Sequence, residues 1–325
     1  MRAVFIQQYG GPEQLMIQEL PDPEPTPGHV LIEVKAFGVN HAETYMRKGE
    51  WAEAAKVSGI ECVGVVKACH DGQFAVGTGV AALMGGLGRT INGSCAQYTR
   101  VPASNVVSIE SKLSWEELAA IPESYATAWT CLHRNLALAA DQTLVIRGAT
   151  SALGQAALNI AAHAGARVIA TTRNRERIPT LEALGARHVE LEGPDLSRRV
   201  RELCPKGSDA VLDLIGNSVI LDSLAMARRG GCVCLAGFLG GLAPIASFNP
   251  LLQMPSGVQF SFFGSFMFGT SEFPLSDVPL QVIFDRVAAG AYKAKPAHVS
   301  RFEDIREAHR MMESNQANGK LVVRV

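Results

Sequence analysis

The sequence predicts an α/β protein in which a doubly wound parallel sheet is joined to a second, irregular β-barrel-like domain. Three observations carry this prediction. From about residue 143, short apolar runs alternate with stretches of helical periodicity, as in a parallel sheet with helical crossovers. One such run, Leu144–Arg147, leads through Gly148 into an alanine-rich helix. The first hundred residues read instead as short strands interrupted by Gly and Pro.

The N-terminal region has the composition of an irregular barrel. Its β-like runs are Val30–Ala36, Gly64–Ala68 and Ala96–Val101, and prolines between 21 and 27 mark an exposed connection before them. Helical periodicity begins at Trp115. We therefore place the first domain at residues 1–116.

Strands and helices alternate in the middle of the chain. The expected elements are a helix at Ala152–Ala164 and strands at Arg167–Thr172, Ala210–Leu214 and Gly231–Ala236. They predict a second domain, built on a parallel sheet with helical crossovers, at residues 117–248.

The rest of the chain is too short to form a third domain. Its expected elements are a β-rich run at Val258–Phe263, helices at Ser276–Ala289 and Phe302–Glu313, and a strand at Gly319–Val325. We therefore expect residues 249–325 to return and complete the first domain.

Charge and cysteine content exclude several classes of protein. The 325 residues contain 30 Lys and Arg against 31 Asp and Glu, so no net field attracts nucleic acid or an anionic membrane. Neither a membrane-spanning run nor a secretory signal is recognisable, and we expect a cytoplasmic protein. The seven cysteines are scattered without a C-x-x-C pair, which indicates reduced thiols rather than disulfides or structural zinc.

The turn after the first middle strand is typical of a dinucleotide site. Gly148 permits a tight turn, and Gly154 removes a side chain so that helix and strand pack closely. Residues Thr150, Ser151, Ala152 and Leu153 would then contact the pyrophosphate at the helix N-terminus. Ser151 replaces the usual middle glycine, so an ordinary strand-to-helix turn is the alternative.

The end of the next strand predicts the choice of nucleotide. Thr172 stands where an acidic residue would bind a ribose 2′-hydroxyl, and Arg173 and Arg177 follow it. Guanidinium groups match phosphate geometry, so this segment favours NADPH over NADH. A solvated basic turn is the alternative.

Short motifs in a fixed order carry a family resemblance over nearly the whole chain. They are Gly10–Glu13, Pro27–Leu31, Gly38–Gly49, Gly59–Val66, Thr127–Trp129, Gly148–Gly154 and Gly319–Lys320. Together they resemble the medium-chain dehydrogenase/reductase superfamily, and within it the zinc-independent quinone oxidoreductases related to zeta-crystallin. The resemblance implies a Rossmann-type nucleotide domain and a GroES-like catalytic domain.

The resemblance also implies the absence of a catalytic metal. Alcohol dehydrogenases of this superfamily bind zinc through three residues, and the matching positions here are Asn40, Ile60 and Glu123. Two strong ligands are missing, whereas zinc sites draw three from Cys, His and Asp or Glu. Without a Lewis acid, a quinone or enone is the expected acceptor, because hydride addition gives a delocalised anion that hydrogen bonds stabilise.

Two residues in the segment that resembles the family's active-site loop are the candidate catalytic groups. Asn40 and Tyr45 could donate hydrogen bonds to the substrate oxygen. Tyr45 could also donate the proton or stack on a flat substrate. The structural alternatives are an Asx-turn residue for Asn40 and a half-buried anchor for Tyr45.

Further residues resemble cofactor-contacting positions of the family: Thr127, Gly237, Phe238, Ser265, Phe266, Asn318 and Lys320. The threonine starts the interdomain helix near the nicotinamide ribose, and the next pair follows the last strand of the sheet. Ser265 and Phe266 resemble a pocket wall, and Asn318 and Lys320 lie in a segment that closes over the cofactor in relatives. Ordinary packing or a solvated turn is the alternative for each.

These inferences predict an NADPH-dependent, zinc-independent oxidoreductase that reduces quinones or similar conjugated carbonyl compounds. Its substrate is expected to be small, hydrophobic and electron-poor. Residues 258–263 resemble the edge strand through which relatives dimerise, which implies a homodimer. A zinc-dependent alcohol dehydrogenase and an NADPH-binding protein without turnover remain the alternatives.

Overall fold

The computed structural model describes residues 1–325, which form two compact units. Unit 1 comprises Met1–Ala126 and Ser265–Val325, and unit 2 comprises Thr127–Gly264. The boundaries expected at 116/117 and 248/249 thus lie at 126/127 and 264/265. No helix combines the length and the apolar character needed to cross a membrane.

Unit 2 is built on a six-stranded, all-parallel sheet. Its strands are β8 (Thr143–Arg147), β9 (Arg167–Thr172), β10 (His188–Leu191), β11 (Ser208–Asp213), β12 (Ala227–Leu235) and β13 (Gln259–Phe262). Their order, β10-β9-β8-β11-β12-β13, is that of a Rossmann fold. The predicted doubly wound parallel sheet is confirmed.

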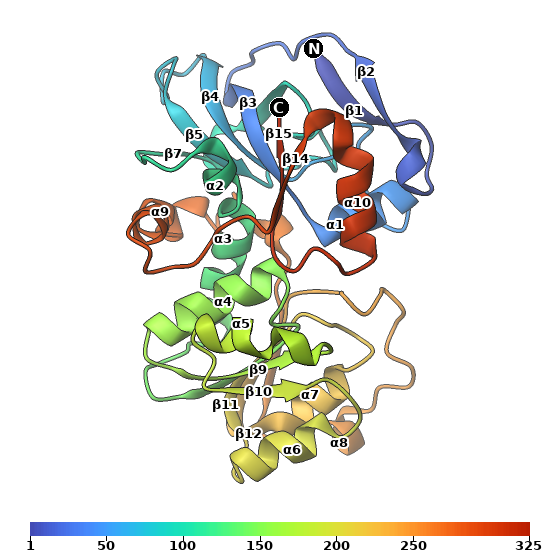
Figure 1. Cartoon of the computed structure of the whole chain (residues 1–325), viewed down its shortest axis with the longest axis vertical. Helices are drawn as coiled ribbons and strands as arrows, with labels where there is room; N and C mark the ends of the chain where they lie inside the picture. The colour runs from blue at the N-terminus through green and yellow to red at the C-terminus, as the bar shows by residue number, and fades with distance from the viewer. The chain divides into compact units, whose positions relative to one another are not determined.

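Helices cover both faces of this sheet. They are α4 (Ala152–His163), α5 (Ile178–Ala183), α6 (Leu196–Leu203), α7 (Ile220–Met226) and the short α8 (Pro250–Gln253). In Figure 1, α4 and α5 lie on one face and α6 and α7 on the other. The crossover helices change from one face of the sheet to the other where β8 and β11 pair, so the turns at the carboxyl ends of these two strands lie side by side. Ligands bind at this position in such folds.

Unit 1 contains a seven-stranded sheet and a separate hairpin. The sheet strands are β3 (His29–Val39), β4 (Glu61–Cys69), β5 (Gly79–Leu83), β6 (Tyr98–Pro102), β7 (Val106–Ser108), β14 (His298–Arg301) and β15 (Leu321–Arg324). The hairpin is β1 (Arg2–Ile6) with β2 (Leu15–Glu19). Because β15 pairs antiparallel with β3, the last residues of the chain belong to the same sheet as the first segment.

The helices of unit 1 are α1 (His41–Lys48), α2 (Trp115–Ala119), α9 (Leu280–Ala288) and α10 (Ile305–Glu313). The helix α3 (Pro122–Thr130) contains the boundary between the units and continues as a π-helical turn, Cys131–Asn135. The two C-terminal helices are shorter than expected: α9 begins after Pro279, and residues 302–304 form a 3-10 turn before α10.

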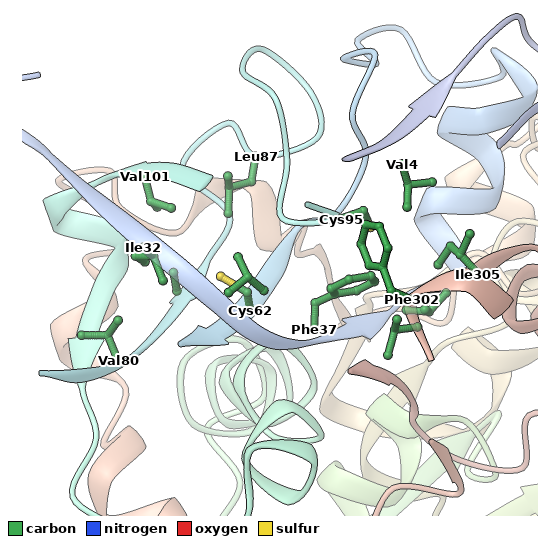
Figure 2. Packing of buried hydrophobic residues seen from close by; sticks show 14 of the residues in the cluster. Val4, Ile32, Phe37, Cys62, Val80, Leu87, Cys95, Val101, Phe302 and Ile305 are labelled. Carbon is green, nitrogen blue, oxygen red and sulfur yellow. The ribbon is translucent and has the colours of Figure 1, made fainter. Parts of the chain in front are cut away.

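Apolar side chains from distant segments form the core of unit 1. Figure 2 shows Val4 of the hairpin, Phe37 of β3, Cys95 of a loop and Phe302 before α10 gathered around the central strands. The rings of Phe37 and Phe302 pack edge to face, 6.4 Å apart. The N-terminal and C-terminal parts of the chain thus share one core, which fixes α1 and β15 next to β3.

The two differences in the domain boundaries have simple causes. α2 packs against β3, β4 and β15, so it belongs to unit 1. β13 pairs with β12 as the last strand of the parallel sheet, so the chain leaves unit 2 only after residue 264.

Candidate functional site

The turn between β8 and α4 has the shape that its glycines predicted. Gly148 has a φ of +78°, in the left-handed region that favours glycine. A Cβ atom on Gly154 would lie 2.5 Å from the carbonyl oxygen of Gly148. Only glycine therefore allows α4 to begin this close to the strand, and both predicted roles are confirmed.

Ser151 caps α4 and leaves two backbone donors in the first turn. Its hydroxyl accepts from the N–H of Gly154 at 3.1 Å and donates to the carbonyl of Gly148 at 2.9 Å. The Thr150 carbonyl accepts from Gln155 at 2.9 Å, which steadies the turn. The N–H groups of Ala152 and Leu153 are then the donors available to an anion at the positive end of the helix.

Arginines without carboxylate partners follow β9. Thr172 ends the strand, and its hydroxyl bonds the N–H and carbonyl of Asn174 at 3.1 and 3.2 Å. Arg173 is exposed and Arg177 is half-buried, and neither forms an ion pair. The strand therefore ends without an acidic residue, and the one glutamate of residues 173–177, Glu176, forms no ion pair with either arginine.

An ion-pair network that the sequence reasoning missed lies beside this turn. The guanidinium of Arg147, 1% exposed, donates to Glu192 through Nε (3.2 Å) and Nη2 (2.6 Å) and to Asp222 through Nη1 (3.0 Å). Burial is the largest single influence and opposes the charge, but the hydrogen bonds to Glu192 and the charges of Glu192, Asp213 and Asp222 together offset it and raise the pKa of Arg147. The signal in the sequence was the charged Arg147 at the end of an otherwise apolar strand.

The turns after β11 and β12 approach each other closely. A Cβ on Gly237 would lie 2.8 Å from the carbonyl oxygen of Leu214, so glycine is required there. The ring of the next residue, Phe238, packs against Phe262 with centroids 5.9 Å apart. Thr127, in α3, is 2% exposed.

Tyr45 lies in helix α1 and Asn40 stands directly before it, whereas the resemblance suggested a loop. Asn40 directly precedes α1, whose first turn holds an acidic residue and whose last turn holds basic ones, and Gly49 ends it with a φ of +76°. Tyr45 is 8% exposed, and the ring of His41 meets it edge to face at 5.1 Å.

A buried polar network in unit 1 surrounds Asn40. The Lys320 ammonium, 4% exposed, donates to Asn40 Oδ1 at 2.7 Å and to Ser124 at 3.4 Å, and it pairs with Glu61. Asn40 Nδ2 donates to Glu61 at 2.9 Å and to Glu43 at 3.3 Å. Both amide hydrogens and the amide oxygen of Asn40 are therefore engaged within the protein.

Glu43 enters this network as a neutral acid. Its side chain is fully buried, and burial raises its pKa to about 8. Its Oε2 has no hydrogen-bond partner, which is tolerable for a protonated carboxyl and costly for an ionised one. At neutral pH the network thus holds one positive charge, on Lys320, and one negative charge, on Glu61.

The other expected contact residues of unit 1 are dispersed. Ser265 Oγ lies 3.9 Å from Met84 Sδ, and the guanidinium of Arg89 lies over the ring of Phe266 at 4.8 Å. Asn318 is exposed with a φ of +54°. The structure thus brings Asn40 and Lys320 together.

The residues at the expected metal positions offer few ligand atoms. Ile60 is buried and offers no ligand atom, and the backbone N–H of Glu123 donates to Glu61 at 2.8 Å. No group of three or more His, Cys, Asp or Glu side chains is arranged to hold a metal ion. All seven cysteines are free thiols.

Two parts of the chain match known families. Residues 26–111 match the alcohol dehydrogenase GroES-like domain, and residues 152–280 match the family described as zinc-binding dehydrogenase. These segments correspond to much of the N-terminal part of unit 1 and to most of unit 2.

Curated relatives have similar sequences over most or all of the chain. It is 29% identical to human quinone oxidoreductase over 246 residues, 74% of each chain. It is also 29% identical to 2-haloacrylate reductase of a Burkholderia species over 339 residues, which covers 99% of this chain and 98% of the relative.

Solved structures match the whole chain. An NAD-dependent alcohol dehydrogenase is 30% identical, covers 100% of both chains and gives a TM-score of 0.84. Escherichia coli quinone oxidoreductase complexed with NADPH shares the fold, with 21% identity, 100% of both chains and a TM-score of 0.88. Both comparisons include each unit in full.

Proposed function

The chain belongs to the medium-chain dehydrogenase/reductase superfamily, in its quinone-oxidoreductase-like branch, and on this premise we propose that it is an NADPH-dependent reductase of quinones or similar conjugated carbonyl compounds that works without a catalytic zinc ion. NADPH, when bound, supplies the hydride. The observation that carries the proposal is the unpaired arginine segment after β9, next to the first-turn donors of α4.

The arginines support NADPH rather than NADH. A carboxylate at the end of β9 would bind the 2′-hydroxyl of NADH, whereas Thr172 offers none. Arg173 and Arg177 can pair with a 2′-phosphate because no carboxylate of the chain competes for them. The solved relatives include both an NAD-dependent enzyme and an NADPH complex. Our choice of NADPH over NADH for this chain therefore rests on the arginine segment.

The buried ammonium of Lys320 supports a reaction without zinc. It donates a hydrogen bond to Asn40 Oδ1 and pairs with Glu61, so the oxygen atoms that could bind a metal ion already bind an ammonium group. A second positive charge in this place would meet electrostatic repulsion in a medium of low dielectric constant. One neutral amide and one engaged carboxylate fall short of the ligand set that zinc requires.

Without a Lewis acid, the acceptor must be activated by its own conjugation. Hydride addition to a quinone or enone places negative charge on an oxygen, which needs a donor and then a proton. Since both amide hydrogens of Asn40 are accepted by the side chains of Glu61 and Glu43, we assign this donation to the hydroxyl of Tyr45. The Asn40 amide then links Glu43 of α1, the helix that carries Tyr45, to Glu61 of β4.

Unsaturated carboxylic acids are a second candidate class of acceptor. The relative that matches nearly the whole chain is named 2-haloacrylate reductase. In unit 1, Arg89 pairs with Glu53 at 2.7 Å while its Nε has no partner, and its guanidinium lies over Phe266. An arginine in this state can bind a carboxylate in exchange for the exposed Glu53.

The edge of the parallel sheet supports a homodimer. β13 is an end strand of the sheet, and Phe260 and Phe262 on it are 36% and 51% exposed. Pairing with the same strand of a second copy would cover this edge and these rings.

The test of the proposed function is a stopped-flow screen of NADPH and NADH oxidation against quinones, enones, unsaturated carboxylates, aldehydes and acyl-thioesters, with metal analysis of the same preparation. We expect oxidation of NADPH by a quinone or enone, with activity that survives chelators. A stoichiometric metal together with activity that chelators abolish would support a zinc alcohol dehydrogenase. Tight NADPH binding with no oxidation across the panel would indicate a binding protein without turnover.

A further inference from the structure

The hydroxyl of Thr171 connects two parts of unit 2 that lie at the nucleotide-binding turn. It accepts a hydrogen bond from the N–H of Gly148 at 3.2 Å and donates one to Glu192 at 2.6 Å. The Thr171 side chain is 0% exposed, so water cannot replace either partner when the hydroxyl is lost. The backbone of the turn is therefore fixed by one side chain of the neighbouring strand β9.

Glu192 is itself held rigidly on its other side. Arg147 binds its carboxylate through two parallel hydrogen bonds, which set the plane as well as the position of the carboxylate. Arg147 also donates to Asp222 at 3.0 Å and to Ser223 Oγ at 3.1 Å. A rotation of Glu192 would break a buried charge pair, so its oxygen is a fixed acceptor for Thr171.

The same glutamate reaches the strand end that carries the arginines. Its backbone N–H donates to the carbonyl of Thr172 at 2.8 Å, one residue before Arg173. The backbone at Gly148 and the backbone at Thr172 are thus tied to one residue, Glu192, either directly or through the Thr171 hydroxyl. These are the segments that precede the first-turn donors of α4 and the unpaired arginines.

We propose that Thr171 is a positioning residue for dinucleotide binding: its hydroxyl, oriented by the Arg147–Glu192 pair, holds the turn at Gly148 in the conformation that presents the N–H groups of Ala152 and Leu153. Thr171 is buried and does not itself contact a ligand. The inference rests on the proposed binding of NADPH. Its physical basis is preorganisation, because a turn that is already ordered loses less entropy on binding.

The test compares two substitutions that differ in one hydroxyl. Thr171→Val keeps the volume and removes the hydroxyl, so the Kd for NADPH should rise about fivefold to tenfold, as expected for one buried hydrogen bond. The Kd is measured by fluorescence titration without an acceptor. In steady-state assays KM for NADPH should rise in parallel while kcat stays unchanged. Thr171→Ser keeps the hydroxyl and should bind within about twofold of the wild type.

Thr99→Val is the matched control. Thr99 lies in β6 of unit 1, is 1% exposed and has a hydroxyl without a partner, so its replacement should leave the Kd unchanged. Circular dichroism verifies folding, and Thr171→Ala, which also lacks the hydroxyl, replaces the valine variant if that one unfolds. Wild-type affinity in the variant without the hydroxyl, or equal losses in Thr171→Ser, would overturn the proposal. Failure of the wild type to bind NADPH would instead overturn the proposed function.

Discussion

Glu43 stabilises unit 1 only while it carries a proton. Burial raises its pKa from 4.5 to about 8, so between these values the folded protein holds a proton that the unfolded chain has lost. The free energy of unfolding therefore falls as the pH rises through this window, by about 1.4 kcal/mol per pH unit from this group alone. Above the folded pKa, Glu43 and Glu61 are both charged while Lys320 supplies one positive charge.

Glu43→Gln should remove this pH dependence. The amide has nearly the same shape and cannot ionise, so the variant should gain stability relative to the wild type by about 1.4 kcal/mol per pH unit between pH 5 and 8. Urea unfolding at several pH values measures the difference. Glu50→Gln, at an exposed glutamate just after α1, is the control and should run parallel to the wild type. Parallel curves for Glu43→Gln would contradict the buried, neutral carboxyl.

The second prediction about single residues concerns the arginines after β9. Arg173→Ala combined with Arg177→Ala should weaken NADPH binding far more than NADH binding, because only NADPH offers a 2′-phosphate. The loss of such charge-assisted contacts costs about 1–3 kcal/mol, and isothermal titration with both nucleotides measures it. Arg187→Ala, at an exposed arginine before β10, is the control. Equal losses for the two nucleotides would refute the assignment.

Among the elements, α4 depends directly on one missing side chain. A Cβ at Gly154 would meet backbone atoms at 2.5 and 2.6 Å, and backbone cannot rotate away as a flexible side chain can. Gly154→Ala should therefore lower the free energy of unfolding by about 1–3 kcal/mol and weaken NADPH binding by shifting the start of the helix. Thermal unfolding and nucleotide titration measure both effects.

Gly193→Ala is the control for the helix prediction, since nothing lies within 4 Å of its added Cβ. We expect little change in stability and none in nucleotide affinity. If the two alanine variants behaved alike, the close contact between α4 and the turn would not be the reason for a glycine at position 154.

Elements with a strong local pattern could be predicted well from the sequence. β9 has the bounds that were expected, and α4 ends one residue before its expected end. The hairpin β1–β2 and the helical state of α1 were missed. Both are short, and their conformation depends on packing against α10 and its neighbours rather than on periodicity.

The parts of the candidate sites that join distant residues could not be predicted. Lys320 and Asn40 are 280 positions apart, and Arg147 and Glu192 are 45 apart. No local pattern encodes which buried ammonium meets which amide, because the partners are chosen by the packing of whole elements. Turns bounded by glycine were predictable, since there a backbone requirement appears in the sequence itself.

For the molecule as a whole, we predict a dimer that depends on the edge of the parallel sheet. Phe260→Lys with Phe262→Lys places charge on β13 and should convert the dimer to a monomer in sedimentation equilibrium. Val299→Lys, on the end strand β14 of the other sheet and 51% exposed in the wild type, is the control and should stay dimeric. A monomeric wild type, or a double lysine variant that remains dimeric, would refute the proposed interface.

The pairing of β15 with β3 has a consequence for synthesis on the ribosome. Unit 2 is continuous in the chain, whereas unit 1 needs residues from both sides of it. The parallel sheet can therefore assemble during translation, while residues 36–39 of β3 must wait for their partners at 321–324. Until then the cysteine thiols and apolar side chains of the nascent first segment lack part of their cover, and this interval is when the polypeptide is most exposed to aggregation and to chaperones.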